Sequence, residues 1–250
     1  MRILARLRSH RLHDEALLLE RPAFYALALG RWRDYVTLLH PPYTIWHLSY
    51  VVLGAALAPT VRYERLGATL LAFFLAMGIA AHALDEANGR PLRTRIPDRV
   101  LYSLTALGLA GAVALGILGA VLASPWLIVF ILFGAFIVPA YNLELFGGRF
   151  HSDFWFALSW GTFPLLTAYW ASAEALAPSA AAGAAAAFLL SLAQRALSAR
   201  VRTVRRRVRD VEGTMTYTDG RRVGLDKRQL VAADERALLL LSVAVATASL

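Results

Sequence analysis

The sequence predicts an all-α protein, a multispanning transmembrane helix bundle of about six to seven spans. Hydrophobic residues make up 58% of the 250 residues and charged residues only 17%, whereas ordinary soluble domains have about 45–50% and about 25%. The apolar residues lie in blocks of roughly 18 to 24, close to the length of about 20 that a helix needs to cross the hydrocarbon core. Composition and block length together exclude a disordered chain and an ordinary soluble domain.

Six apolar blocks are expected to form the spans. They cover residues 43–60, 67–84, 100–123, 125–140, 154–172 and 178–197. A seventh apolar run, residues 237–250, is shorter than a full span, so it is either a short last span, which we favour, or an interfacial helix.

The blocks divide the chain into four regions. Residues 1–40 mix arginines with acids and predict an amphipathic arm on the membrane surface. Residues 41–197 form the transmembrane bundle, and 237–250 the short apolar end. Residues 198–236 predict a basic helix followed by a small hairpin, in which Asp219-Gly220 favours a type I′ turn.

Arginine placement predicts the orientation. With the N-terminus in the cytoplasm, Arg90, Arg93, Arg95, Arg149 and the basic stretch after residue 195 all face the cytoplasm. The opposite side keeps only Arg62 and Arg65 with a few acids. We therefore expect a multi-pass protein of the cytoplasmic (inner) membrane.

Charge and cysteine usage exclude several functions. The formal net charge is +9, but in such an apolar chain the basic residues mark cytoplasmic loops, so no nucleic-acid partner is expected. The arginines after residue 199 are read first as attracting lipid headgroups and second as binding a substrate phosphate. The chain has no cysteine, which excludes disulfides, thiolate metal sites and cysteine nucleophiles. Any metal must bind to oxygen or imidazole.

Two loops carry the candidate chemistry, because ionisable groups at the ends of apolar helices are costly unless they are paired or liganded. In the first loop, His82, Asp85 and Glu86 have the i, i+3, i+4 spacing of ligands on one helix face. The second loop follows the fourth span and offers Tyr141, Glu144, Arg149, His151 and Asp153. In the predicted topology both loops emerge on the same side, so we expect them to meet at one site. His47, one turn inside the first span, is expected to bond across helices instead.

The order of these features resembles the UbiA superfamily of membrane prenyltransferases. In that family a proline-rich entry to the first span precedes an aspartate motif and Arg-Pro-Leu after the second span, and a tyrosine-led basic loop follows the fourth. Here Pro41-Pro42, Asp85 with Arg90-Pro91-Leu92, and Tyr141 with Arg149 occupy those places. The chain departs from the pattern at His82, which replaces a family aspartate, and after the sixth span, where the second aspartate motif is replaced by arginines.

The resemblance implies a UbiA-like fold and an enzyme that acts on an isoprenoid (prenyl) diphosphate or a related lipid at the cytoplasmic face. It implies Asp85, Glu86 and Asp153 as catalytic residues, and a divalent metal held by His82, Asp85, Glu86, Glu144 and His151. It also implies substrate contacts from Arg90, Arg93, Arg95, Tyr141 and Arg149. Mg²⁺ is the expected ion, while the histidines shift the preference toward Mn²⁺, Fe²⁺ or Zn²⁺.

Two alternatives stay open. One is a metal-dependent lipid enzyme of the same fold that does not transfer a prenyl group. The other is a non-catalytic lipid-binding membrane subunit, in which the incomplete aspartate motif has no chemical role.

Overall fold

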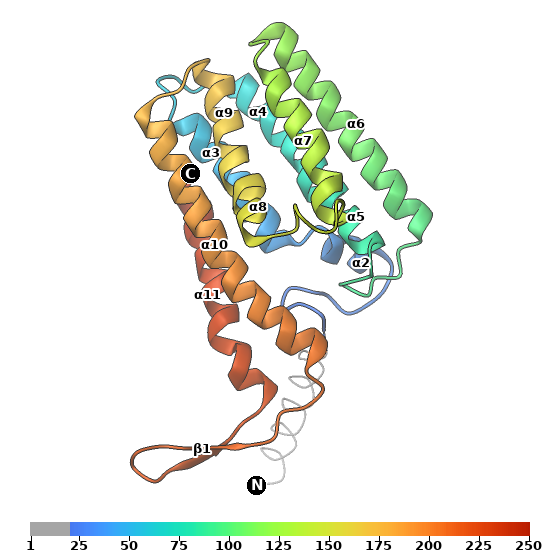
Figure 1. Cartoon of the computed structure of the whole chain (residues 1–250), viewed down its shortest axis with the longest axis vertical. Coiled ribbons are helices and arrows are strands. Elements are labelled where there is room, and N and C mark those ends of the chain that lie inside the picture. The colour runs from blue at the N-terminus through green and yellow to red at the C-terminus, as the bar shows by residue number, and fades with distance from the viewer. Residues whose placement is uncertain (1–20) are drawn as a thin grey trace.

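The computed structural model describes residues 21–250, so residues 1–20 of the predicted arm 1–40 lie outside that range. The bundle is helical, and its helices run roughly along one axis (Figure 1). Its elements in chain order are α2 (Arg31–Leu38), α3 (Pro41–Ala56), α4 (Tyr63–Phe73), η1 (Phe74–Ala81), α5 (His82–Ala87), α6 (Asp98–Leu122), α7 (Leu127–Asn142), α8 (Asp153–Ala157), η2 (Leu158–Thr162), α9 (Phe163–Ala173), α10 (Pro178–Arg207), β1 (Thr214–Thr216), β2 (Arg222–Gly224) and α11 (Lys227–Ala248).

Each predicted apolar block coincides with a helix or with a helix interrupted by a π-helical turn. By length and apolar composition, three helices of the described chain can cross a membrane: Tyr63–Ala87, Asp98–Leu122 and Pro178–Arg207. The α7 helix is also apolar, but it has only 16 residues. The prediction of a membrane protein is therefore supported, whereas a full set of six or seven spans remains a prediction.

The α6 helix gives the clearest reason to place the bundle in lipid. It is apolar on all sides, yet only Leu101, Thr105 and Gly108 are buried. Leu107 and Val121 expose 72% and 76% of their surface. A helix that is hydrophobic all round is stable only when it is buried, either in protein or in a membrane. Since protein covers little of α6, lipid is the environment that suits it.

Close helix packing depends on small residues. A Cβ atom on Gly54 of α3 would lie 2.1 Å from the carbonyl oxygen of Leu165 on α9. A Cβ on Gly161 would meet Ser191 Oγ of α10 at 2.4 Å. Glycine is therefore required at both crossings, which is the packing mode typical of helices in membranes.

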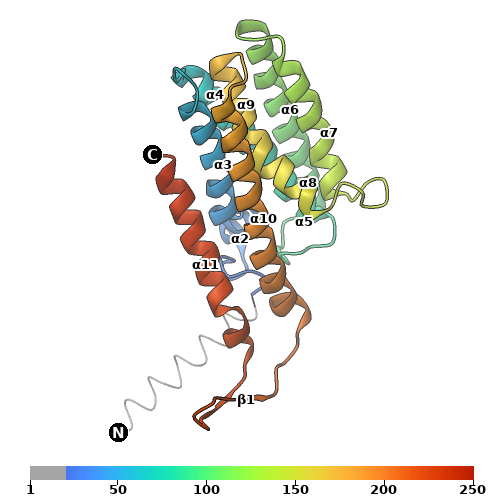
Figure 2. The same ribbon diagram turned by 60° about the vertical axis from the view of Figure 1, so that its left-hand side comes forward.

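The two C-terminal helices, α10 and α11, extend beyond the rest of the bundle, and the hairpin connects them at that end (Figures 1 and 2). Asp226 caps α11 in a capping box with Gln229. The side chain of Arg205 on α10 is 5% exposed and pairs with Glu235 of α11 through contacts of 2.5 and 3.0 Å. These contacts fix α11 against the basic end of α10.

The hairpin was predicted correctly, but its turn was not. β1 and β2 pair antiparallel, with Met215 opposite Val223. The Tyr217 amide donates to the carbonyl of Arg221, so the loop has three residues, and only Gly220 has a positive φ. A type I′ turn needs positive φ at two central residues. Asp219 instead accepts a hydrogen bond from the Arg221 amide at 2.9 Å, which favours a longer loop that ends in glycine.

Candidate functional site

A polar cavity of about 360 Å³ lies at the end of the bundle where α10 leaves it. Six parts of the chain enclose it: residues 22–25, the start of α3, the end of η1 with α5 and the residues after it, the end of α7 with the α7–α8 connection, α8 with η2, and α10. We call this cavity the chamber. Its titratable and amide side chains include Tyr25, His40, Tyr43, His47, His82, Asp85, Asn88, Tyr141, Asn142, Glu144, His151, Gln194, Arg195, Arg202, Arg206 and Arg207.

Both π-helical turns lie beside the chamber. The turn η1 ends directly before His82, and η2 carries Trp160. π-Helical turns inside α-helices are often found at functional sites. Met77 of η1 and Trp160 of η2 pack together in an apolar cluster, and both also line the chamber. The inner wall of the chamber is therefore apolar, while the wall near the loops is polar.

The two loops chosen from the sequence do meet. The Asn88 side chain donates a hydrogen bond of 2.9 Å to the backbone carbonyl of Asn142. Of the predicted site residues, His82, Asp85, Tyr141, Glu144 and His151 line the chamber.

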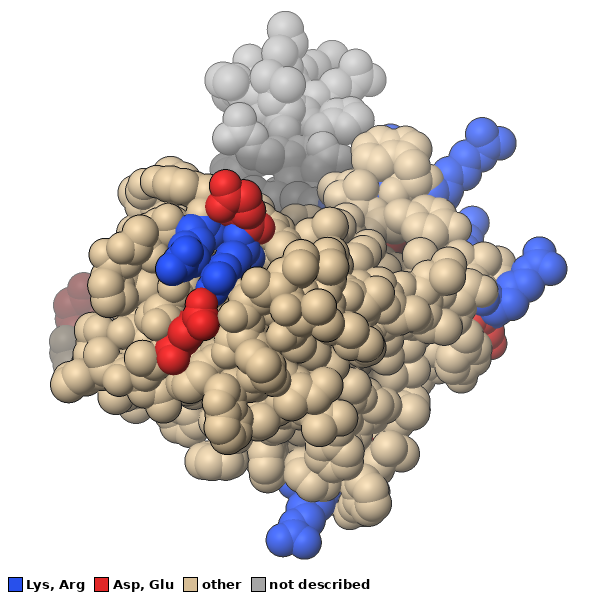
Figure 3. Space-filling view, turned by 90° about the horizontal axis from the view of Figure 1, so that it is seen from above, with Lys and Arg blue, Asp and Glu red and all other residues tan. Residues whose placement is uncertain are grey.

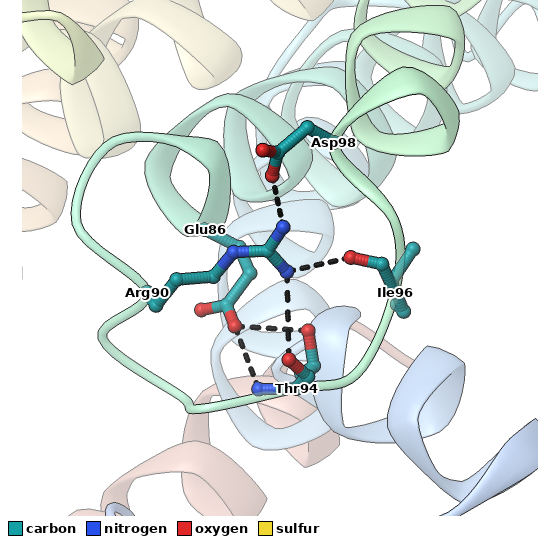
Figure 4. A network of polar contacts seen from close by, with 5 residues as sticks. All are labelled: Glu86, Arg90, Thr94, Ile96 and Asp98. Carbon is teal, nitrogen blue, oxygen red and sulfur yellow. Dashed lines mark hydrogen bonds and ion pairs between the residues drawn. The ribbon is translucent and has the colours of Figure 1, made fainter.

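Glu86 and Arg90 have structural roles instead of the predicted catalytic and substrate-binding ones. Glu86 is fully buried and accepts hydrogen bonds of 2.8 Å from the amides of Leu92 and Thr94, and one of 2.9 Å from the Thr94 hydroxyl. Arg90 donates to the carbonyls of Thr94 and Ile96 and pairs with Asp98 (Figure 4). The spacing argument was wrong for Glu86 because residues 88–97 fold back over it.

The remaining predicted residues lie around the chamber and do not line it. Arg93, Arg95 and Arg149 are exposed. Asp153 is exposed too, but its carboxylate accepts a hydrogen bond of 2.9 Å from Arg195, which does line the chamber. Asp153 therefore acts on the site only through Arg195.

The predicted metal ligands do not assemble into a metal site. Within residues 21–250, no three His, Asp or Glu side chains are arranged to hold an ion. Glu86 is used by the loop, and Glu144 is exposed at the rim. Asp85 is thus the one predicted carboxylate that lines the chamber from within the bundle. These donors do not fit a pair of magnesium ions, which need several oxygen ligands.

Two histidines are fixed by backbone carbonyls. Nδ1 of His82 donates to the carbonyl of Gly78 at 3.2 Å, and Nδ1 of His151 donates to the carbonyl of Tyr141 at 3.0 Å. When Nδ1 of a neutral imidazole carries the proton, Nε2 is left as an acceptor. Both rings can therefore accept a hydrogen bond from a group in the chamber.

His40 joins the outer part of the chamber to its centre. Its ring stacks on that of His82 with centroids 4.1 Å apart, and Nδ1 shares a hydrogen bond of 3.0 Å with the Tyr25 hydroxyl. Burial lowers the pKa of His40 well below 6.5, and the nearby His82 lowers it further. Burial likewise raises the pKa of Tyr25, with Tyr43 adding to the effect. Both groups are therefore neutral near pH 7.

Several buried polar atoms around the chamber have no hydrogen-bond partner among residues 21–250. They are Nε2 of His40, Nδ1 of His47, the Tyr141 hydroxyl and Oε1 of Gln194. A buried polar atom normally has a partner, either protein or ordered water. Four such atoms around one cavity indicate that a polar group belongs there. The expectation that His47 bonds to a neighbouring helix is confirmed by its hydrogen bond to the backbone of Trp160 on η2, which leaves Nδ1 facing the chamber.

Arginines of α10 make the chamber basic. Arg202 donates to the Ser198 hydroxyl at 3.0 Å and Arg206 to the carbonyl of Pro22 at 3.2 Å. Within the described chain, neither guanidinium has a carboxylate at ion-pair distance. Both lie on the face that also carries Gln194 and Ser198, at intervals of four residues. That spacing was visible in the sequence, but the packing of α10 decides that this face is the one that points into the chamber.

Comparisons of the chain with protein-family models, with curated proteins and with solved structures find no match. The resemblance to the UbiA superfamily thus stays a prediction that rests on sequence motifs alone.

Proposed function

We propose that this chain is an integral membrane protein that binds a phosphate-bearing isoprenoid or a related lipid, with the head group in the chamber. The proposal rests on one observation: two kinds of group without partners lie around the same cavity. Within the part of the chain that the structure describes, Arg202 and Arg206 lack carboxylate partners, and four buried polar atoms lack any partner. A ligand head with several anionic oxygens satisfies both.

Charge and shape favour a phosphate over a neutral polar head. Guanidinium groups pair two oxygens at once, so they suit phosphate and diphosphate groups. The volume of about 360 Å³ lies at the lower end of the range of about 300–1,000 Å³ for ligand pockets. It has room for a head group and the first part of a tail. The apolar side chains of Met77, Phe156 and Trp160 suit that part of the tail, and the rest extends between helices into lipid.

Within this proposal the arginines replace most of the charge that metal-bound carboxylates would supply. If the carbon–oxygen bond of a prenyl diphosphate breaks, negative charge grows on the departing diphosphate, and cations fixed in place stabilise that change. Asp85 is then placed to interact with the carbocation side or with an acceptor. The same fixed cations also suit a protein that binds the lipid without reaction, which is the second candidate.

Binding is tested by titration of the purified protein with geranylgeranyl diphosphate. We expect Arg202→Gln to weaken binding about tenfold or more, because a charge-assisted hydrogen bond contributes about 1.5–3 kcal/mol. Arg200→Gln is the matched control, since Arg200 lies on the same helix, pairs with Asp234 and does not line the chamber. Geranylgeraniol, which has no phosphate, should bind much more weakly. Equal affinities for wild type and Arg202→Gln would refute the proposal.

A second measurement separates an enzyme from a binding protein. Asp85→Asn should keep the affinity for the diphosphate within a few-fold, because the arginines supply most of the attraction. If the protein is a transferase, the release of inorganic diphosphate in the presence of membrane extract should stop in this variant. If neither wild type nor variant releases diphosphate, the non-catalytic reading is favoured.

A further inference from the structure

A second cavity lies away from the chamber, between α4, η1, α6, α7 and α9. It has a volume of about 500 Å³, and its walls are almost entirely apolar. We propose that this cavity is a separate binding site for one acyl chain of an anionic phospholipid, with the phosphate of that lipid beside Arg62. This inference does not depend on the function proposed for the chamber.

Small residues line much of this cavity. Ala68, Ala72 and Ala76 recur at intervals of four along α4 and η1, and Gly116 and Gly119 of α6 line the cavity on the side of α7. Small residues let membrane helices approach closely, and α6 does approach η1 closely at Gly108, where a Cβ atom would meet the carbonyl oxygen of Leu75. The small side chains leave space between α4, α6, α7 and α9, and that space is the groove.

The groove opens to the surroundings of the bundle. Leu118 and Leu122 line it, and they are also 52% and 72% exposed. Its two threonines need no ligand, since Thr69 donates to the carbonyl of Arg65 and Thr167 to that of Phe163, each at 2.7 Å. The body of the groove therefore suits a hydrocarbon chain and offers nothing to a polar molecule.

The rim of the groove suits an anionic head. Arg62 and Arg65 line it together with Glu64. Arg65 is paired with Glu174 at 2.7 Å. Arg62 donates only its Nε, to the carbonyl of Ser172 at 3.2 Å, and within residues 21–250 it has no carboxylate at ion-pair distance. Arg62 is also exposed, so its terminal nitrogens can reach a phosphate.

Few charged side chains lie at the end of the bundle that holds the rim of the groove. Figure 3 shows one small group of basic and acidic side chains on a surface that is otherwise largely uncharged. The connections at this end, residues 57–66, 123–126 and 174–177, contain two arginines and two glutamates: Arg62, Arg65, Glu64 and Glu174. A lipid head group near this face thus has Arg62 as its available cation.

The groove is long enough to hold an acyl chain across one leaflet. Fourteen residues separate Arg62 from Ala76, which corresponds to about 21 Å along a helix. Half of a hydrocarbon core of about 30 Å is about 15 Å. A chain whose head lies at Arg62 therefore reaches the inner end of the groove from the leaflet on this side, opposite the chamber.

The test is native mass spectrometry of the purified chain, mixed with equal amounts of palmitoyl-oleoyl phosphatidylglycerol and phosphatidylcholine. We expect one retained phosphatidylglycerol per chain. Ala72→Leu with Ala112→Leu fills the groove and should lower its occupancy about tenfold. Ala114→Leu is the matched control, because Ala114 lies on α6, is exposed and does not line the groove. Equal retention by the filled variant and the control would overturn the inference.

Two further variants keep the test decisive if the filled groove disturbs folding. Arg62→Gln should reduce the preference for phosphatidylglycerol over phosphatidylcholine several-fold without removing bound lipid. Arg202→Gln should leave the retained lipid unchanged. If Arg202→Gln removes the lipid and Arg62→Gln does not affect it, the lipid belongs to the chamber and the second site is refuted. The proposal for the chamber would survive that result.

Discussion

The same helices form both ends of the bundle, but the connections between the helices differ at the two ends. At the chamber end, long connections fold back over the helix ends and bury polar groups, among them Glu86 and Asp34. The four histidines that the structure describes all line the chamber. At the opposite end the connections are short, and their arginines lie at the surface near Ala171 and Ser172. The difference teaches that this chain builds its chemical site where polar helix ends, such as those with His82 and Arg202, meet long connections that cover them.

Arg62 and Arg202 make the contrast concrete, because neither has a carboxylate partner within the described residues. Arg202 lies in a cavity with four unpartnered buried polar atoms. Arg62 lies at the rim of an apolar groove. The first surrounding suits a head group enclosed by protein, and the second suits a head group that remains at the membrane surface.

The contrast between the chamber end and the opposite end would not hold if the two ends lay on the same side of the membrane. The chain has no cysteine, so single cysteines can be introduced without background. Arg149→Cys marks the chamber end and Ala175→Cys the opposite end, and both positions are exposed. On intact cells we expect an impermeant thiol reagent to label Ala175→Cys and not Arg149→Cys, because arginine-rich ends stay in the cytoplasm.

Permeabilised cells provide the control, in which both cysteines should react. Labelling of Arg149→Cys alone would reverse the orientation. Equal labelling of both positions on intact cells would mean that the bundle does not cross the membrane.

The next largest effect is expected at Glu86, where the chamber end depends on one buried carboxylate. Glu86→Ala leaves the amides of Leu92 and Thr94 without an acceptor. Each unsatisfied buried group costs about 1–3 kcal/mol. We expect a loss of about 3 kcal/mol in the free energy of unfolding, measured by chemical denaturation in detergent.

Glu144→Ala is the control for that experiment, because Glu144 is exposed and no hydrogen bond of its carboxylate supports a loop. It should change the free energy of unfolding by less than about 0.5 kcal/mol. A similar loss in both variants would show that Glu86 does not support the connection over residues 88–97.

Glu86 also illustrates how far the sequence could predict this protein. The apolar blocks predicted the long helices, although α11 begins at Lys227, well before its block of residues 237–250, and the hairpin followed from residues 214–225. The i, i+4 spacing of His82 and Glu86 predicted that both side chains face one site, but spacing says nothing about a loop that returns and covers one of them. Residues 88–97 fold back because Glu86 satisfies their amides, and that contact joins groups whose pairing no local pattern fixes.

For the arginines of α10, binding of a substrate phosphate was the second interpretation and not the first, for a different reason. Their number favoured contact with lipid head groups, and that interpretation suits exposed members such as Arg209. The members at intervals of four from Gln194 share one helix face. Only the packing of α10 against the loops turns that face inward, so the difference between Arg200 and Arg202 is a property of the tertiary structure.

The smallest effect concerns acid, and it should again distinguish the two ends. The folded protein holds His40 neutral because burial lowers its pKa, and the unfolded chain binds a proton near pH 6.5. The unfolded state therefore binds more protons below pH 6.5, and stability falls as the pH falls. At pH 5.5 the contribution of His40 to this loss is about 1.4 kcal/mol if the folded site is still neutral. Between pH 7.5 and 5.5 we expect wild type to lose about 1.4 kcal/mol more of its free energy of unfolding than His40→Gln loses, measured by denaturation in detergent.

Arg65→Gln, at the opposite end, is the control. It breaks a partly exposed ion pair with Glu174 and should change the free energy of unfolding by about 0.5 kcal/mol at both pH values. If His40→Gln keeps the full pH dependence of wild type, acid sensitivity arises elsewhere, and His40 is not held neutral by the chamber.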